Sequence, residues 1–275
     1  MSLTLTMRSA PEVPLEAEVL SPERFEGMSA AQAAEAAVLY GNRRAQLGDF
    51  FSIEGKGDGE LRLVGDCTRV KRIGAAMTRG RIVIEGDVGM HLGAGMSGGT
   101  ITVQGDAADS VGHEMLGGQI VVKGNAGHLV GSTIRGGRVG IRGGEIIVHG
   151  NVGNETGTGM RRGLIAVGGY AGDFTGANML AGTIVVLGQL GWRSGAGMKR
   201  GSIVSTQPAE LLPTFRYACT YRPVMLRLVL AHLRAQGLPV TDAHVHGRYR
   251  RWSGDAVEDS RGEILLLEHS ERAAA

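Results

Sequence analysis

Apolar and polar residues alternate in a short phrase that returns at regular intervals through the middle of the chain. In its clearest copy, Gly80 to Gly86, Ile82 and Ile84 alternate with Arg81, a valine and Glu85. This period of two is typical of a strand that buries one face. The phrase opens again at Gly99, Gly118, Gly144, Gly163, Gly182 and Gly201. The steps between these openings are 19, 19, 26, 19, 19 and 19 residues, which predicts a repeat architecture.

The length of the repeat selects the fold. A unit of 19 residues is too short for a β-α-β unit, which needs roughly 30 residues or more. It fits one coil of a parallel β-helix, and a weaker copy at Leu61 to Gly65 begins the series. We therefore predict an all-β fold whose coils stack at about 4.8 Å, the strand-pairing distance. The general preference of crossover connections predicts that the β-helix is right-handed.

Other positions of the coil recur as well. Asp or Asn follows most strand copies, as at Asp87 and Asn125, and these residues suit tight turns. A methionine column comprises Met77, Met96, Met115, Met160, Met179 and Met198, and Ile134 takes its place in the longer coil. Because methionine fills irregular apolar gaps, we predict that the column lies in the core. Cys67 shares a column with Val88 and is also expected to be buried.

The repeat divides the chain into three parts. Residues 1–58 are predicted to form an N-terminal strand and a helical cap, residues 59–206 the β-helix, and residues 207–275 a small α/β extension. In the first part, Leu3 to Thr6 reads as a strand. Ser29 is expected to cap a helix from Ala30 to Tyr40, closed by Gly41, that covers the open end of the coils.

The predicted extension contains one helix and a last strand. The helix begins at Pro223, ends at Gly237 and has Leu226, Val229, Leu230 and Leu233 on one side. The strand covers Arg261 to Glu268, and Ala273 to Ala275 are expected to be frayed.

The step of 26 residues holds two adjoining copies of the strand phrase, Gly137 to Gly143 and Gly144 to Gly150. Seven residues cannot close a coil, so one copy must form an outward loop or bulge. The loop is either a tolerated insertion or, through Arg135, Arg138 and Arg142, a contact for an anionic ligand or a partner. The sequence leaves both interpretations open.

Composition narrows the function classes. The chain has 275 residues, 46 of them Gly, a net charge of +2 and only 4% aromatic residues, so no aromatic platform for bases or sugars is indicated. Its two cysteines favour neither a disulfide scaffold nor a metal cluster. Met1 to Thr6 begins no long apolar run, so we expect a cytoplasmic protein without signal peptide or membrane span. A free-standing polysaccharide lyase would need a secretory signal and a groove of acids and aromatics.

Candidate metal ligands are few. His244 and His246 form a His-x-His pair that on a strand would share one face, as in zinc hydrolases, but only 29 residues follow for further ligands. His91, His113 and His128 stand at offsets 11, 14 and 10 from their coil starts and are therefore not expected to stack into a ligand set. Asp66, Asp87 and Asp106 do stack, and we interpret them as solvated turn residues. We expect neither a metal site nor a catalytic residue.

One basic column precedes the opening glycines of several coils, and it comprises Arg79, Arg161, Arg162, Lys199 and Arg200. It is either ordinary solvated surface or a positive track for a polyanionic tail or an acidic partner. Arg138 and Arg142 in the longer step are second candidates for the same role.

The repeat Gly-x-Ile-x-Val-x-Gly-(Asp/Asn)-x-Gly followed by Gly-x-Gly-Met resembles the C-terminal Gly-rich β-helix of the glutamate synthase large subunit. It is more similar to the C subunit of formylmethanofuran dehydrogenase. The likeness extends outside the repeat to Pro14–Glu18, Gly41-Asn42, Leu47–Phe51 and Phe215–Tyr217, and so covers nearly the whole chain.

The resemblance implies a noncatalytic subunit of a cytoplasmic hetero-oligomeric complex. In the bacterial version, the formyltransferase/hydrolase complex, formyl passes from tetrahydromethanopterin to a methanofuran analogue, methylofuran, and is hydrolysed to formate. Its partners would be an amidohydrolase-like subunit, a molybdopterin-protein-like subunit and a formyltransferase subunit, without nucleic acid or membrane. The Arg-rich, Lys-poor composition favours this version. The alternatives are the archaeal tungsten or molybdenum enzyme and a pure assembly module. The glutamate-rich tail of such cofactors makes the basic column a candidate guide.

Overall fold

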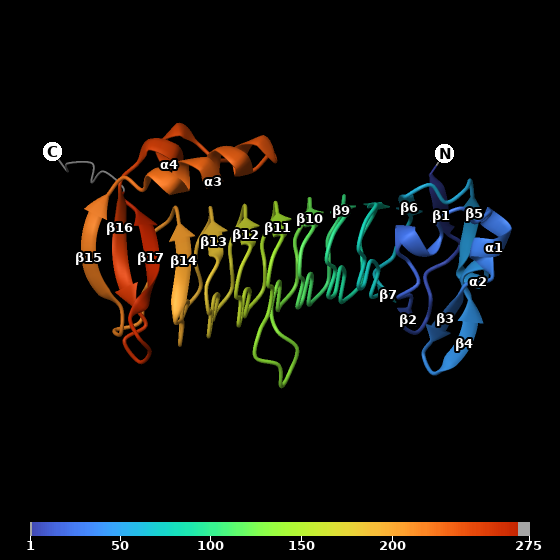
Figure 1. Ribbon diagram of the computed structural model, residues 1–275, viewed down its shortest axis with the longest axis horizontal. Coiled ribbons are helices and arrows are strands. Elements are labelled where there is room, and N and C mark those ends of the chain that lie inside the picture. Colours follow the sequence, from blue (N-terminus) through green and yellow to red (C-terminus); the bar gives the residue numbers. More distant parts are fainter. Residues whose placement is uncertain (1, 269–275) are drawn as a thin grey trace.

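The strand phrases stack side by side in a computed structural model that describes residues 2–268 (Figure 1). Each strand of the repeat pairs in parallel with the next, and Ile120 lies between Ile101 and Ile146. The stacked strands are β6 (Glu60–Val64), β8 (Arg81–Glu85), β9 (Thr100–Val103), β10 (Gln119–Val122), β11 (Glu145–Val148), β12 (Leu164–Val167), β13 (Thr183–Val186) and β14 (Arg200–Ser205). The predicted strands and their register are confirmed, including the weaker first copy, which is β6. Within the described residues they belong to one open, mixed sheet of 13 strands.

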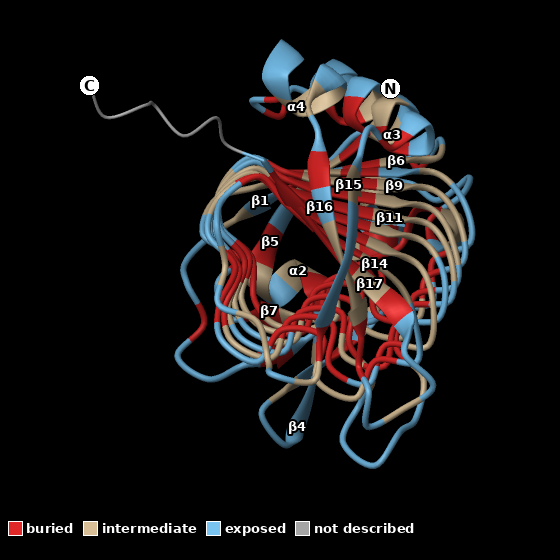
Figure 2. Cartoon of the chain, turned by 90° about the vertical axis from the view of Figure 1, so that its left-hand side faces the viewer, coloured by how far each residue is buried: buried red, intermediate tan, exposed pale blue. Residues whose placement is uncertain are grey.

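The inward positions of every coil form a continuous apolar core (Figure 2). Ile82, Ile84 and the six predicted methionines are fully buried, as expected. The core also explains why each of these coils opens with a glycine. Gly118 has φ +86°, and a Cβ placed there would lie 2.7 Å from Cε of Met96 in the preceding coil. A larger residue would therefore meet both backbone strain and the methionine column.

The methionine column is completed by Ile141 and not by Ile134, which corrects the sequence prediction. Ile141 is fully buried, whereas 49% of Ile134 is exposed. The backbone N–H of Arg142 donates to Met115 O at 2.7 Å, as that of Leu116 does to Met96 O one coil earlier. The extra residues are therefore 134–140, a loop that projects from the stack beside β11 (Figure 1). Of the two strand copies, the one at Gly144 forms the ladder.

The turn after each strand is held by a side-chain ladder. Oδ1 of Asp87 accepts a hydrogen bond from the backbone N–H of Asp106 at 2.7 Å, and Asp106 accepts from Asn125 at 2.7 Å. Asn125 and Asn151 continue the pattern at 2.9 and 2.8 Å. These side chains are thus acceptors for the next coil, not merely solvated charges. Cys67 lies beside this ladder and forms a parallel β-bridge with Val88. It is buried, which confirms the prediction.

The N-terminal part covers one end of the stack mainly with strands, and its helices are short. β1 (Leu3–Met7) pairs in parallel with β6, and β5 (Phe51–Glu54) pairs with β1. The remaining elements are β2 (Leu15–Glu16), η1 (Pro22–Arg24), α1 (Ala30–Ala34), β3 (Ala37–Tyr40), β4 (Arg43–Gln46), α2 (Leu47–Phe50) and β7 (Val70–Lys71). Strands β4, β3, β2 and β7 form a second sheet. Leu20, Phe25, Leu47 and Phe51 are buried against the first coils.

The predicted helix from Ala30 to Tyr40 is too long. Ser29 caps it in a capping box with Gln32, as expected, but the helix ends at Ala34. The following residues form β3, which turns at Gly41-Asn42 and pairs with β4 as a hairpin. Val38, Leu39 and Tyr40 favour a strand, and a two-residue turn at a glycine with φ +60° closes the hairpin.

The C-terminal part extends the same sheet and lays a helix over it. β17 (Arg261–Leu267) pairs in parallel with β14, and β16 (Tyr249–Gly254) and β15 (Arg216–Tyr221) follow antiparallel. α3 (Val224–Ala235) and α4 (Asp242–His246) lie on the outer face of the sheet (Figure 2). The predicted helix and last strand are confirmed. Ala273 to Ala275 lie outside the described residues.

α3 changes the burial of the strands beneath it. The middle outward residues Val121, Ile147, Ala166 and Val185 are buried together with Leu230 and other apolar residues of α3. The alternation with one buried face therefore holds for the first coils, and the later strands are buried on both faces. No helix in residues 2–268 has the length and apolar character needed to cross a bilayer.

Candidate functional site

Five of the predicted basic residues lie on one side of the later coils and are exposed. We call them the basic stripe, and they are Arg142, Arg161, Arg162, Lys199 and Arg200. Arg142, Arg161 and Lys199 occupy equivalent positions, each directly after a buried residue of the methionine column. Their backbone N–H groups donate to the preceding coil at 2.7, 2.9 and 2.8 Å. Leu180 takes this position in the coil between Arg161 and Lys199, so the two cations are two coil steps, about 10 Å, apart.

Arg79 and Arg138 do not join the basic stripe. Arg79 lies three coils before Arg142, about 14 Å along the stack. Its guanidinium forms an ion pair with Glu26 of the N-terminal part, and the hydrogen bond to this carboxylate raises the pKa of Arg79. Arg138 is exposed in the projecting loop. Arg142, a second candidate in the sequence, therefore lies in the stripe next to Arg161, whereas Arg79 lies outside it.

The charges of the stripe are largely uncompensated. Among the described residues, only Lys199 has an ion-pair partner, Glu258, with Nζ and Oε2 3.6 Å apart. Arg142, Arg161, Arg162 and Arg200 are exposed and have no carboxylate within ion-pair distance in residues 2–268. A row of exposed guanidinium groups can bind carboxylates at successive coils, although each contact is worth about 1 kcal/mol or less and is screened by salt.

A cavity of about 620 Å³ lies beneath the projecting loop. Its wall includes His91, His113 and Arg135, and the Glu114 carboxylate accepts hydrogen bonds from Thr133 and Ile134 at the root of the loop. The Nδ1 atoms of the two histidines are 3.3 Å apart. The two rings meet although their offsets within the coil differ, because side chains of adjacent coils reach one another. His128, whose Nδ1 accepts a hydrogen bond from the N–H of Asn154, does not line this cavity.

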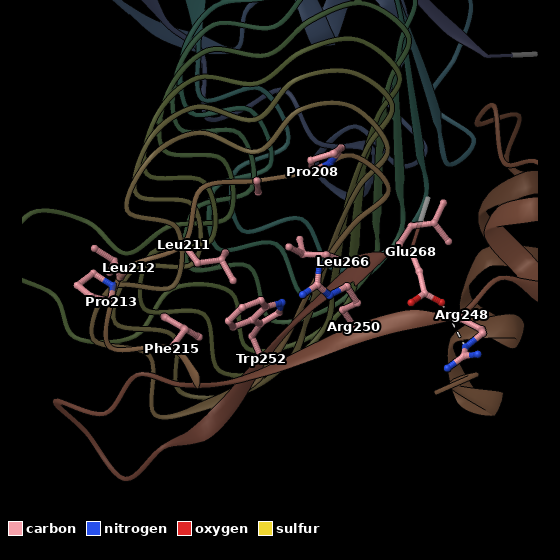
Figure 3. A pocket seen from close by; sticks show the side chains of 12 residues that line it. Pro208, Leu211, Leu212, Pro213, Phe215, Arg248, Arg250, Trp252, Leu266 and Glu268 are labelled. Atoms are coloured by element: carbon pink, nitrogen blue, oxygen red, sulfur yellow. Dashed lines mark ion pairs between the residues drawn. The ribbon is translucent and has the colours of Figure 1, made fainter. Parts of the chain in front are cut away.

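A second cavity, of about 920 Å³, opens at the C-terminal end of the stack (Figure 3). Leu211, Phe215 and Trp252 give it an apolar wall, and Arg250 stacks over the Trp252 ring at 5.6 Å. Arg248 pairs with Glu268, with Nε and Oε2 3.3 Å apart. Its residues come from two segments far apart in the chain, so no local sequence signal marks it.

The His-x-His segment is a helix and not a strand. His244 and His246 lie in α4, two residues apart, so their side chains do not share one face. The Nδ1 atom of His244 instead accepts a hydrogen bond from the N–H of Thr241 at 3.2 Å. No group of three or more His, Cys, Asp or Glu side chains in residues 2–268 has the arrangement of a metal site.

Comparisons with known proteins place the chain in a family. The family described as GXGXG motif matches residues 100–215. The C subunit of the tungsten-containing formylmethanofuran dehydrogenase 2 of Methanothermobacter marburgensis is 42% identical over 95 residues, which cover 33% of this chain and 35% of that protein. The C subunit of the molybdenum-containing formylmethanofuran dehydrogenase 1 of Methanosarcina barkeri is 40% identical over 93 residues, 32% of this chain and 31% of that protein. The matched segment thus spans about a third of these curated relatives.

A solved structure matches over nearly the full length. It is a chain of the formyltransferase/hydrolase complex (FhcABCD) from Methylorubrum extorquens in complex with methylofuran. That chain is 36% identical, has a TM-score of 0.91, and the alignment covers 97% of this chain and all of the other. Sequence and fold agree over this length, and the chain therefore belongs to the family of formylmethanofuran dehydrogenase C subunits.

Proposed function

We propose that this chain is a noncatalytic subunit of a formyltransferase/hydrolase complex of one-carbon metabolism. The complex would move formyl from tetrahydromethanopterin to a methanofuran analogue such as methylofuran and hydrolyse it to formate in the cytoplasm. The observation that carries this proposal is the full-length likeness to a chain of a complex that holds methylofuran. The partners would be an amidohydrolase-like subunit, a molybdopterin-protein-like subunit and a formyltransferase subunit.

We propose further that the coils form a right-handed parallel β-helix at residues 59–206, flanked by the cap at 1–58 and the extension at 207–275. The parallel register and the second ladder of bridges from Cys67 to Leu190 support this architecture. Such a stack presents side chains of successive coils at a constant step of about 4.8 Å. This regular spacing suits a repetitive ligand better than a single pocket does.

The basic stripe would guide the anionic tail of the cofactor. A glutamate-rich tail carries one carboxylate per residue, and the stripe offers exposed, uncompensated guanidinium groups along one side of the coils. Arginine suits this role because its planar guanidinium binds carboxylates through two donors. Weak contacts would let the tail move between two active sites of the complex.

The proposal is tested by replacing Arg161, Arg162 and Arg200 with Gln together and assaying the intact complex at low and high salt. A guide predicts that the triple variant needs more cofactor at low salt, and that the difference from wild type shrinks at high salt. A variant that matches wild type at both salt concentrations in a fully assembled complex reduces the stripe to solvated surface. The chain would then be an assembly module.

The second candidate is the C subunit of an archaeal-type tungsten or molybdenum formylmethanofuran dehydrogenase. The partial matches to the Methanothermobacter and Methanosarcina proteins favour it. The two candidates are separated by the complex isolated with the chain. Tungsten or molybdenum and iron–sulfur proteins in that complex support the archaeal type, and formyl transfer without redox metals supports the bacterial type.

A further inference from the structure

The helix α3 has an apolar outer face in addition to its buried one. Val224, Met225 and Leu228 are 72%, 64% and 73% exposed, and Met225 also borders a small cavity at the edge of the helix with Glu263 of β17. We call these three residues the α3 ridge. The outer face continues with the exposed residues Ala231 and Ala235, so it is uncharged along the length of the helix.

The inner face of the same helix is fully occupied. Leu226, Leu230 and Leu233 are at most 4% exposed and pack on the outward residues of the strands. Near the end of the helix, Nε2 of His232 lies 3.0 Å from Oε2 of Glu145 in β11, which anchors α3 along the sheet. A helix that is apolar on both sides is typical of a buried helix. The α3 ridge therefore has the composition of a surface that is covered in the assembled protein.

Carboxylates do border α3, namely Glu145 beside His232 and Glu263 beside Met225, but each is paired within this chain, Glu145 with His232 and Glu263 with Arg251. From Pro213 to Thr241 the sequence has four arginines and no Asp or Glu. Arg234 is paired with Asp242, with Nη2 and Oδ1 2.9 Å apart. Arg222 and Arg227, at the start of α3, have no ion-pair partner in the part of the chain that the structure describes. These two arginines are therefore available to pair with carboxylates of a partner.

We infer that the α3 ridge docks into an apolar groove bordered by carboxylates on another protein of the complex. This inference rests on the proposed function, because the partner belongs to the same assembly. Helix-in-groove docking uses apolar anchors on one face of a helix, with complementary charges at the rim. A second copy of this chain does not fit, because a symmetric contact would set the arginines of one copy against those of the other.

The first experiment identifies what covers the ridge. A photo-crosslinking amino acid replaces Leu228 in the tagged full-length chain, and Leu39, an exposed apolar residue of the N-terminal part, serves as the control site. After irradiation in the native cells, mass spectrometry is expected to find one partner peptide, flanked by Asp or Glu, that is linked from position 228 and not from position 39. Linkage to a second copy of this chain, or no defined polypeptide, overturns the inference. Sedimentation of the chain with vesicles of anionic phospholipid, lost on Leu228→Glu, would assign the ridge to a membrane surface instead.

The second experiment measures the contribution of the ridge to assembly. The double variant Met225→Glu and Leu228→Glu should lower the molar ratio of other subunits to this chain by about tenfold or more after purification. Val257→Glu, at a residue 76% exposed, is the matched control and should keep the wild-type ratio. Circular dichroism and thermal unfolding of the isolated variants verify that both remain folded.

The charge of the rim is tested separately. Arg222→Glu with Arg227→Glu should weaken assembly at low salt, and Arg222→Lys with Arg227→Lys should retain it. If the wild-type chain assembles with other subunits and all ridge variants do so equally well, the docking inference fails and the proposed function stands. If the tagged wild-type chain is isolated alone, the proposed function itself fails.

Discussion

His91 and His113 lie on adjacent coils with their Nδ1 atoms 3.3 Å apart and their rings inclined at 79°. Burial is the main cause that lowers the pKa of both imidazoles, and the neighbouring His113 lowers the pKa of His91 further. Lys71 and Arg72 act in the same direction on His91, while Glu16 opposes them. The pair is therefore held neutral in the fold at a pH where the unfolded chain takes up protons.

This pair predicts a pH dependence of stability. A histidine whose pKa is lowered by folding binds fewer protons in the native state, so stability is retained above the unfolded pKa of 6.5 and falls as the pH drops below it. We expect the urea midpoint of wild type to fall more between pH 7.5 and 5.5 than that of the double variant His91→Asn and His113→Asn. Equal slopes for the two proteins would contradict the assignment.

Ile120 tests the register of the stack. Ile120→Ala removes buried methylene groups between Ile101 and Ile146 and should lower the free energy of unfolding by about 2–5 kcal/mol. Thr102→Ala, on the outward side of β9, should change it by about 0.5 kcal/mol or less. Urea unfolding followed by circular dichroism measures both. Similar effects at the two positions would mean that the inward face is misassigned.

Asp106 tests the side-chain ladder at the turns. Asp106→Ala removes the acceptor of the Asn125 backbone N–H and should destabilise the chain by about 1 kcal/mol, because the exposed amide can turn to water. Asp106→Asn keeps an acceptor oxygen in place and should retain most of this stability. The comparison of the two variants in urea unfolding isolates the hydrogen bond from the loss of a turn residue.

Removal of the projecting loop tests whether it is a contact or an insertion. Deleting residues 134–140 joins Thr133 to Ile141 and restores a step of 19 residues, with Ile141 still in the methionine column. We expect an unchanged or slightly higher melting temperature, because a shorter loop costs less entropy on folding. A folded deletion variant that no longer assembles with its partners would show that the loop is a contact. Normal assembly and activity would mark it as a tolerated insertion.

Arg142 and Arg79 separate the stripe from ordinary surface charge. Arg142→Gln, in the intact complex, should raise the cofactor requirement at low salt, because Arg142 adjoins Arg161 along the coils. Arg79→Gln should leave the cofactor requirement unchanged, since its guanidinium is engaged by Glu26 outside the stripe. Equal effects of the two substitutions would argue against a localised track.

Much of the fold follows from local periodicity. The alternation at Ile82 and Ile84 and the step of 19 residues predict the strands and their register, because each coil repeats the environment of the last. The end of α1 does not follow from the sequence, because the Ala-rich residues before Val38 continue a helical composition while the hairpin depends on pairing with β4. Ile134 and Ile141 are the same residue type, and only contacts with neighbouring coils decide which of them is buried.

The candidate sites were less predictable because they depend on residues of different coils. Arg142 belongs to the stripe because the extra loop precedes it in the coil, and Arg79 pairs with Glu26 because the N-terminal part folds against the first coils. The apolar residues of α3 suggested one buried face in the sequence. The sheet occupies that face, and the exposed apolar residues of α3 form a second one.

The turn ladder has a direction. Asp87, Asp106, Asn125 and Asn151 each accept a hydrogen bond from the backbone of the coil that follows in the sequence. During translation the N-terminal part and the early coils leave the ribosome first, so every acceptor of this ladder is in place before its donor is made. Each new coil then meets an unpaired strand edge and a side-chain oxygen that can accept its backbone N–H. The protein can thus grow by addition of coils to a finished template, in the order in which its residues are synthesised.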